Sequence, residues 1–282
     1  MKPIEAQDVD GIVVSHEEVA DDFRHLKIKI EGAFVDAKPG QFVQLLPGRA
    51  TSWPLLRIPL SISHIDLTAS TFSVLYEIVG SKSEALSRLR ISDPVSCLGP
   101  LGHPFPPPPV GARPLLVGGG IGVPPLIHLG AHLRSGGLSP ILIVGARHAG
   151  KHLPPKLLSP ATSDLRQATD DGTLGHHGFV TDLLAVALKE LAVALKEDVA
   201  STATDQPVIY TCGPHPMMAA VARAAEEAGV LCYASLEEYM ACGFGVCVGC
   251  VVERSTTPTS AYEQFTRVCV DGPVYDAREI LW

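Results

Sequence analysis

The stretch Pro114-Leu-Leu-Val-Gly-Gly-Gly-Ile-Gly-Val-Pro124 decides the fold of the second half of this 282-residue chain. An apolar run, a group of glycines and a proline opening the next apolar segment predict a strand, a tight loop and a helix. Residues 140–144 predict a second strand. Residues 206–211 predict a third and last strand, followed by a helix over about 216–228. Strands that alternate with helices in this order indicate a parallel sheet with crossover helices.

Upstream of this stretch, residues 11 to about 100 carry short alternating runs. In residues 26–30 apolar side chains alternate with lysines, and Phe72, Val74, Tyr76 and Ile78 share one face of another run. A period of two is the strand period, and turn residues separate the runs, so we expect an antiparallel barrel or sandwich. Four consecutive prolines at 106–109 predict a stiff domain boundary.

A heptapeptide, Leu-Ala-Val-Ala-Leu-Lys-Glu, occurs twice in succession, at residues 184–190 and 191–197. Seven residues make almost two helical turns, so the repeat preserves one apolar face. It predicts a single lengthened helix.

The cysteines near the C-terminal end form the most specific motif. Cys242, Cys247, Cys250 and Cys269 follow the spacing C-x4-C-x2-C, with the fourth cysteine after 18 further residues. This is the plant-type spacing of a [2Fe–2S] cluster, and the glycines between the cysteines let the loop wrap closely around it. A structural zinc site is the main alternative, although zinc usually takes two short C-x2–4-C pairs and only one is present.

Further motifs contain residues that could bind phosphates or flat rings. The glycines at 118–122 let a backbone approach a pyrophosphate at a helix N-terminus, and a plain tight turn is the alternative. Cys212-Gly-Pro ends a strand, where open α/β sheets bind ligands, but it also fits a buried cysteine before a turn. In the N-terminal half, residues 57–61 and 76–83 offer cations, hydroxyls and a tyrosine able to stack on a flat ring, yet also fit ordinary surface and turn positions.

Composition excludes several function classes. The net charge is −8 and no Lys/Arg cluster appears, which disfavours nucleic-acid binding. Uninterrupted apolar runs of membrane-spanning length and an apolar signal core are both absent from the sequence, so we expect a cytoplasmic protein. HExxH, GxSxG and Walker motifs are absent too, which disfavours zinc proteases, serine hydrolases and P-loop NTPases. His176 and His177 are expected in a solvated loop.

Taken in order, the segments RIPLSI, YEIVGSKS, GPLGHPF, LLVGGGIGVPPL, TCGPHPM, EEYMACGFGVCVGC and CVDGPVYD closely resemble the electron-transfer subunits of type B dihydroorotate dehydrogenase, in the ferredoxin reductase superfamily. The resemblance covers nearly the whole chain. It implies an FAD-binding β-barrel over 1–108, an NAD-binding parallel α/β domain over 109–233 and a small [2Fe–2S] domain over 234–282.

The resemblance also assigns site residues. For FAD they are Pro59, Leu60 and Ser61 in the motif R-P-x-S, Tyr76, Glu77 and Ile78 on a strand beside the flavin, and Gly80, Lys82 and Ser83 in a phosphate loop. For NAD they are Gly118, Gly119, Gly120, Ile121, Gly122, Gly213 and Pro214, with Cys212 positioning the nicotinamide rather than bonding to it. For the cluster they are the four cysteines. Ile58 stands where the family usually has arginine, so either Arg57 reaches the flavin phosphate or Lys82, which replaces a glycine, supplies the charge.

The implied activity lies in pyrimidine biosynthesis. Electrons pass from the FMN of a catalytic partner chain, which oxidises dihydroorotate, through the cluster and FAD to NAD⁺. A flavin can join the two-electron nicotinamide to a one-electron cluster. The family implies a heterotetramer, and we expect an exposed apolar patch near the cluster. A related subunit of a sulfide dehydrogenase or ferredoxin:NADP reductase, and a non-enzymatic metal-binding module, remain alternatives. Arg147 either meets a 2′-phosphate of NADP or is a surface arginine.

Overall fold

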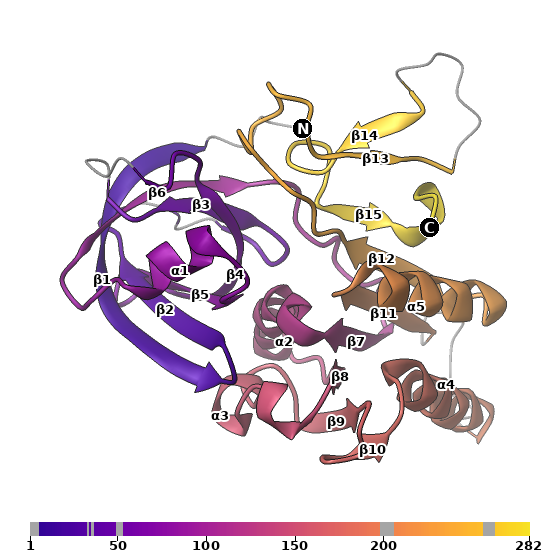
Figure 1. Ribbon diagram of the computed structural model, residues 1–282. Coiled ribbons are helices and arrows are strands. Elements are labelled where there is room, and N and C mark those ends of the chain that lie inside the picture. Colours follow the sequence, from indigo (N-terminus) through magenta and orange to yellow (C-terminus); the bar gives the residue numbers. More distant parts are fainter. Residues whose placement is uncertain (1–5, 33, 35–36, 49–52, 198–205, 256–262) are drawn as a thin grey trace.

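The computed structural model describes residues 6–32, 34, 37–48, 53–197, 206–255 and 263–282. A closed barrel and an open sheet lie side by side, and the C-terminal segment lies against both (Figure 1). The predicted combination of an antiparallel barrel with a parallel α/β domain is confirmed.

Six antiparallel strands close the barrel in the order β1-β2-β5-β4-β3-β6. They are β1 (Gln7–Ala20), β2 (Phe23–Lys29), β3 (Phe42–Leu46), β4 (Ile58–Asp66), β5 (Thr71–Glu77) and β6 (Pro94–Leu101), with α1 (Ser81–Ser87) between β5 and β6. The alternation predicted for β5 is confirmed, because Phe72, Val74 and Tyr76 all point into the barrel core and Ile78 packs against it.

The second body is a seven-stranded sheet in the order β10-β9-β8-β7-β11-β12-β15. Its strands are β7 (Arg113–Gly119), β8 (Ile141–Ala146), β9 (Asp164–Thr169), β10 (His176–His177), β11 (Pro207–Cys212), β12 (Leu231–Ser235) and β15 (Val274–Asp276). All pair in parallel except β15, which runs antiparallel to β12. The three predicted strands are confirmed as β7, β8 and β11. The expectation that β11 is the last strand is wrong, since β12 and β15 follow it.

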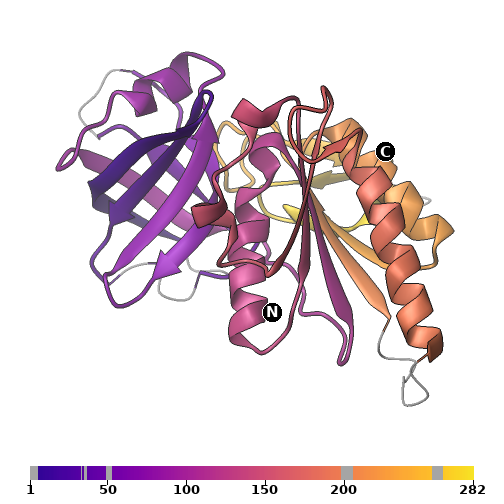
Figure 2. The ribbon, with the colours of Figure 1, turned by 90° about the horizontal axis from the view of Figure 1, so that it is seen from below.

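Helices cover both faces of the sheet (Figure 2). The barrel-side face carries α2 (Pro124–Ser135) and the short α3 (Pro155–Leu158), and the opposite face carries α4 (Val180–Glu197) and α5 (His215–Glu227). The tandem heptapeptide lies in α4, so the lengthened helix is confirmed. Leu184 of the first copy is buried and its equivalent Leu191 packs partly buried against the same core, whereas the equivalent pair Val186 and Val193 is exposed. His176 and His177 are exposed, as expected, but form the edge strand β10 rather than a loop.

The segment that carries the four predicted ligand cysteines lies between β12 and β15. It contains the hairpin β13 (Val251–Glu253) and β14 (Phe265–Arg267), and its two ends meet where Ser235 pairs with Val274. Its buried cysteines, Cys250 and Cys269, share a hydrophobic core with α4, α5 and Phe42 of the barrel. The segment is therefore anchored to both bodies.

Contacts between barrel and sheet fix the two bodies against each other. Helix α2 packs on β4, and the Asp21 N–H donates to the Gly150 carbonyl at 2.8 Å. Three short 3₁₀ turns, η1 (Gly120–Gly122), η2 (Ala149–Lys151) and η3 (Ala277–Glu279), complete the described elements. Within the described ranges, helices long and apolar enough to cross a membrane are absent.

Candidate functional site

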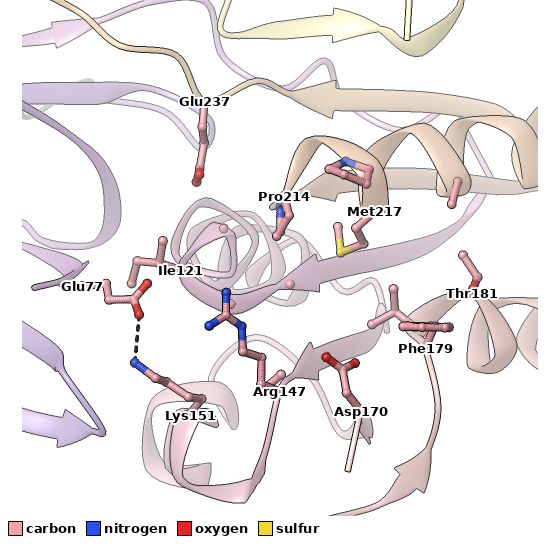
Figure 3. Close-up of a pocket in the computed structure, with 18 of the residues that line it drawn as sticks. Glu77, Ile121, Arg147, Lys151, Asp170, Phe179, Thr181, Pro214, Met217 and Glu237 are labelled. Atoms are coloured by element: carbon pink, nitrogen blue, oxygen red, sulfur yellow. Dashed lines mark hydrogen bonds and ion pairs between the residues drawn. The ribbon is translucent and has the colours of Figure 1, made fainter. Parts of the chain in front are cut away.

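A pocket of about 550 Å³, here called the sheet pocket, lies at the carboxyl ends of the parallel strands. Its lining includes Gly119–Gly122 at the end of β7, Gly145–Arg147 at the end of β8, Asp170 after β9 and Pro214 after β11. Figure 3 shows Glu237 directed toward this space from the chain that follows β12. This edge is where open α/β sheets bind ligands.

A second pocket of about 790 Å³, the barrel pocket, lies between the barrel and the chain after β12. Its lining includes Ile58–Ser61, Leu75–Glu77, Val79–Ser83 and residues 235–240. Glu77, Ile121 and Glu237 line both pockets. Molecules bound in the two pockets would therefore meet at these three residues.

The glycine loop packs closely against the turn after β11. A Cβ built on Gly122 would lie 2.4 Å from the Cα of Gly213, whereas one on Gly120 would meet no atom within 4 Å. Gly119, Gly120, Ile121 and Gly122 line the sheet pocket, while Gly118 packs against α2 behind it. Apart from Ile121, the loop thus places backbone, rather than side chains, along the pocket wall.

Cys212 lies behind the junction of the two pockets. Its side chain is fully buried, and burial raises the pKa of the thiol well above its ordinary value. The Sγ donates toward Glu237 Oε1 at 3.8 Å, the outer limit for a sulfur contact. Glu237 is open to the pocket space but surrounded by protein on its other sides, which raises the pKa of its carboxyl. A buried neutral thiol does not suit a nucleophile. Cys212 is not among the described residues that line the two pockets, so its positioning of the nicotinamide stays a prediction.

Three successive residues of β5, Leu75, Tyr76 and Glu77, line the barrel pocket. The Tyr76 ring packs in the barrel core, the residue is 1 % exposed, and its hydroxyl bonds to His16 Nε2 at 2.8 Å. A ring buried in this way presents no open face for stacking, while the place of Tyr76 beside the flavin stays a prediction. Ile78 packs against the same core and lines neither pocket among the described residues.

Of the two candidate phosphate partners, only Lys82 lines the barrel pocket. The Arg57 guanidinium is turned away, donating to Asp8, to Ser96 and to the Gln44 carbonyl at 2.9–3.3 Å. The option that Arg57 reaches the flavin phosphate is corrected accordingly, because these partners belong to the barrel wall.

The remaining predicted FAD residues lie together around the barrel pocket. Pro59, Leu60, Ser61, Gly80 and Ser83 all line it. The Ser83 hydroxyl accepts the N–H groups of Val79 and Gly80 and donates to the Gly80 carbonyl. Ser83 therefore shapes the loop rather than offering a free hydroxyl.

A lysine that the sequence did not single out joins the two bodies at the pockets. Lys151 Nζ donates to Glu77 Oε1 at 2.8 Å and to Asp22 Oδ2 at 3.0 Å, and lies 5.1 Å from the centre of the Phe23 ring (Figure 3). Partial burial lowers the pKa of Lys151, but the bonds to both carboxylates outweigh it and raise the pKa. Lys151 and Glu237 carried no local sequence signal, because their partners lie far away along the chain.

The four cysteines form two pairs. The Cys247 N–H donates to Cys242 Sγ, and the Cys269 N–H donates to Cys250 Sγ, each at 3.4 Å. Partial burial raises the pKa of Cys242, but N–H groups of the loop outweigh it and lower the pKa to about 6. In the described part of the chain, arrangements of three or more His, Cys, Asp or Glu able to hold a single metal ion are absent. Two thiol pairs suit a two-iron cluster better than one tetrahedral zinc.

The sheet pocket and barrel pocket also fit the groups that the motifs predict. The open glycine wall beside the N-terminus of α2 suits a pyrophosphate, and Lys82 with the Gly80 loop suits a second one. The long barrel pocket, which meets the sheet pocket at one end, suits a flavin dinucleotide.

Comparison with known proteins agrees with these sites. Residues 237–281 match the model of the iron-sulfur cluster binding domain of dihydroorotate dehydrogenase B. The chain is 37 % identical over 272 residues to the dihydroorotate dehydrogenase B (NAD(+)) electron transfer subunit of Listeria welshimeri, covering 95 % of this chain and 96 % of that one. The chain belongs to the family of dihydroorotate dehydrogenase B electron transfer subunits. The family member of Bacillus velezensis is 36 % identical over 272 residues, with 95 % and 96 % coverage. The resemblance predicted from the motifs is thereby confirmed.

Solved structures support the same fold. A structure of an NADH-dependent reduced ferredoxin-NADP oxidoreductase, studied for flavin-based electron bifurcation, superposes with a TM-score of 0.78 and 27 % identity, covering 96 % of this chain and 90 % of that one. The ferredoxin reductase in carbazole 1,9a-dioxygenase superposes with a TM-score of 0.66 and 21 % identity, covering 80 % and 67 %. The second likeness concerns the fold alone.

Proposed function

We propose that this protein takes electrons from a dihydroorotate dehydrogenase catalytic chain and delivers them to NAD⁺. The observation that carries the proposal is the convergence of three sites. The two pockets share Glu77, Ile121 and Glu237, and the segment 235–240 that lines the barrel pocket reaches Cys242 two residues later. Two residues of chain span at most roughly 7 Å, so the cluster loop starts beside the barrel pocket.

In this proposal the barrel pocket holds FAD, the sheet pocket holds NAD⁺, and Cys242, Cys247, Cys250 and Cys269 hold a [2Fe–2S] cluster. When bound, these groups supply hydride exchange, one-electron exchange and a flavin that connects the two. The domain limits 1–108, 109–233 and 234–282 are part of the same proposal.

The chain's own residues orient and shield the reacting ends. Gly119–Gly122 present backbone to the pyrophosphate of NAD⁺, and Lys82 supplies a cation to that of FAD. Lys151 holds Glu77 at the pocket junction, and the Cys212 thiol holds Glu237 opposite it. Ile121 separates the two pockets with an apolar side chain, which limits water at the point where the two ligands meet.

The cluster loop also offers a surface for the catalytic chain. Phe244, Val246 and Val248 lie between the ligand cysteines and are 53 %, 74 % and 55 % exposed. Apolar side chains gathered in this way are typical of protein–protein contacts. We propose that this surface contacts the FMN-containing partner in a heterotetramer, and that the complex works in the cytoplasm, where thiolate ligands stay reduced.

Two observations favour a second candidate, a subunit that serves another electron partner. The relative with a TM-score of 0.78 is a reduced ferredoxin-NADP oxidoreductase, and Arg147 lines the sheet pocket where a 2′-phosphate could lie. The higher identity to the dihydroorotate family, 37 % against 27 %, places this candidate second.

The test is reconstitution with a partner. The protein is purified anaerobically, assayed for iron, sulfide and flavin, and titrated with NADH. It is then mixed with an FMN-containing dihydroorotate dehydrogenase chain, and dihydroorotate-dependent reduction of NAD⁺ is followed at 340 nm. We expect about two iron and two sulfide per chain, bleaching by NADH, and NAD⁺ reduction only with both chains present.

Two cysteine variants provide the matched comparison. Cys250→Ser removes a proposed ligand, and Cys97→Ser changes a cysteine buried in the barrel core. We expect Cys250→Ser to lose the cluster and the dihydroorotate-dependent reaction, while Cys97→Ser keeps both. Zinc in place of iron and flavin would defeat the proposal. NADP⁺ reduction driven by ferredoxin, without a response to dihydroorotate, would select the second candidate.

A further inference from the structure

Gln44 is a residue of the barrel wall that the cluster loop covers. Its neighbours Val43 and Leu45 point into the barrel core, so the Gln44 side chain points outward. It is nevertheless 0 % exposed. Gly243, the residue after Cys242, lies over it, and a Cβ built there would be 2.2 Å from Gln44 Nε2. Gly243 has a φ of +78°, in the left-handed region, and its backbone packs directly against the Gln44 side chain.

The Gln44 carboxamide lacks hydrogen-bond partners among the described residues. Both Nε2 and Oε1 are buried and unpaired. Nearby Gln41, also buried, has a partner at each polar side-chain atom: its Nε2 donates to the Gly102 carbonyl at 2.9 Å and its Oε1 accepts the Lys38 N–H at 2.8 Å. Because buried polar groups in folded proteins are normally paired, the unpaired amide against Gly243, which follows Cys242 in the chain, points to a partner that belongs to the loaded cluster site.

The backbone of Gln44 is held in place between the two proposed cofactor sites. Its carbonyl accepts the Arg57 guanidinium at 3.3 Å, and its register partner on β4 is Pro59, which lines the barrel pocket. The amide therefore lies on the part of the barrel wall that separates the barrel pocket from the cluster loop. Arg57, which does not line the barrel pocket, therefore helps to hold the Gln44 backbone in place.

We propose that Gln44 is a positioning residue of the cluster site, whose carboxamide N–H donates to an anionic sulfur at the Cys242 side of the loaded cluster. This inference rests on the proposed [2Fe–2S] site. Hydrogen bonds to the sulfurs are among the features that set the potential of an iron–sulfur cluster. The bond stabilises the more negative reduced state and fixes the loop against the barrel.

The test is an EPR-monitored redox titration of the anaerobically purified holoprotein. Gln44→Leu keeps the approximate size of the side chain and removes the amide. We expect its cluster to be harder to reduce than that of the wild type, by a tenfold change in the reduction equilibrium, which is 59 mV for a one-electron couple. Gln41→Leu is the matched control, because it removes a buried glutamine already paired within the barrel. It is expected to keep the wild-type potential and EPR spectrum.

Gln44→Glu keeps the test decisive if Gln44→Leu does not retain iron. A protonated carboxyl keeps one O–H donor, whereas an ionised one removes the donors and adds a negative charge, so in the second state its potential is expected to fall further than that of Gln44→Leu. Loss of iron in both Gln44 variants with retention in Gln41→Leu would support the same positioning role. A Gln44→Leu protein with full iron and an unchanged potential and spectrum overturns the inference. A wild type that binds no cluster would instead defeat the proposed function.

Discussion

Gly120 and Gly122 lie two residues apart in the glycine loop. Replacing either one by alanine is predicted to destabilise the protein, for a different physical reason at each position. At Gly122 the new Cβ would lie 2.4 Å from both the Cα and the N of Gly213. At Gly120 it would meet no atom within 4 Å, but φ is +53°, in the left-handed region. Gly120 lines the sheet pocket, so its added methyl group enters ligand space.

The magnitudes follow from these contacts. Carbon atoms prefer separations of about 3.5–4.0 Å, so Gly122→Ala requires the loop and the turn after β11 to separate by roughly 1 Å. Overpacking costs about 1–3 kcal/mol, and backbone on both sides puts this variant at the upper end, about 3 kcal/mol. Gly120→Ala pays only the left-handed strain, about 1 kcal/mol. At roughly 2–4 °C per kcal/mol, the expected falls in Tm are roughly 6–12 °C and 2–4 °C.

The assay combines thermal unfolding with NAD⁺ binding by titration calorimetry. Gly137→Ala is the control, because Gly137 has φ of +88°, open space around its Cβ position and no place in the sheet pocket lining. We expect Gly120→Ala to weaken NAD⁺ binding and Gly137→Ala to leave it unchanged, at similar cost in stability. A wild-type Tm for Gly122→Ala refutes the packing argument. Equal NAD⁺ affinity of the Gly120 and Gly137 variants refutes the assignment of the pocket.

Three further predictions concern charged residues. Lys151→Met removes a side chain that is 16 % exposed and bonded to two carboxylates. The free energy lost on breaking these ion pairs lies between the losses for exposed and for buried pairs, so we expect the free energy of unfolding in urea to fall by about 2 kcal/mol. We also expect a higher KM for NAD⁺. Arg57→Met is expected to lower the free energy of unfolding by about 2 kcal/mol and to leave the flavin Kd unchanged. Lys82→Met is expected to raise the flavin Kd about tenfold and to leave stability unchanged. The opposite pattern would restore Arg57 as the phosphate partner. Burial raises the pKa of Glu237, so the folded state binds more protons than the unfolded state between the ordinary and raised values, and stability falls as pH rises through that window. Glu237→Gln should lack this fall in Tm series from pH 4 to 8, and an identical pH profile would contradict the sign.

Local pattern was sufficient for much of the fold. Apolar runs next to glycine and proline located β7, β8 and β11, and period-two alternation located β2 and β5 of the barrel. The same alternation placed Tyr76 with Phe72 and Val74, which already implied an inward ring. The stacking role rests on residue type alone, whereas the parity of the strand decides the direction of each side chain.

The parts of the site that sequence did not predict depend on distant contacts. Lys151 meets Glu77 across 74 residues, and Glu237 meets Cys212 across 25. Arg57 lay one residue from the expected position, and its actual partners on β1, β3 and β6 follow only from barrel closure. Strand β15 was missed because three residues after a cysteine loop carry too short a pattern, and it is defined by pairing with β12.

A single edge of the sheet explains why three sites can converge in so short a chain. The parallel strands β7, β8, β9 and β11 all end at the sheet pocket, and β12 ends there too because it is parallel to β11. Since β15 is antiparallel, it starts at that same edge, so Ser235 and Val274 close the base of the cluster segment beside the pockets. Residues 235–240 and Pro273, the two chain ends of this segment, both line the barrel pocket. Any displacement of the β12–β15 pair would therefore move the cluster loop and the barrel pocket wall together, whereas lengthening α4 at its far end leaves all three sites in place.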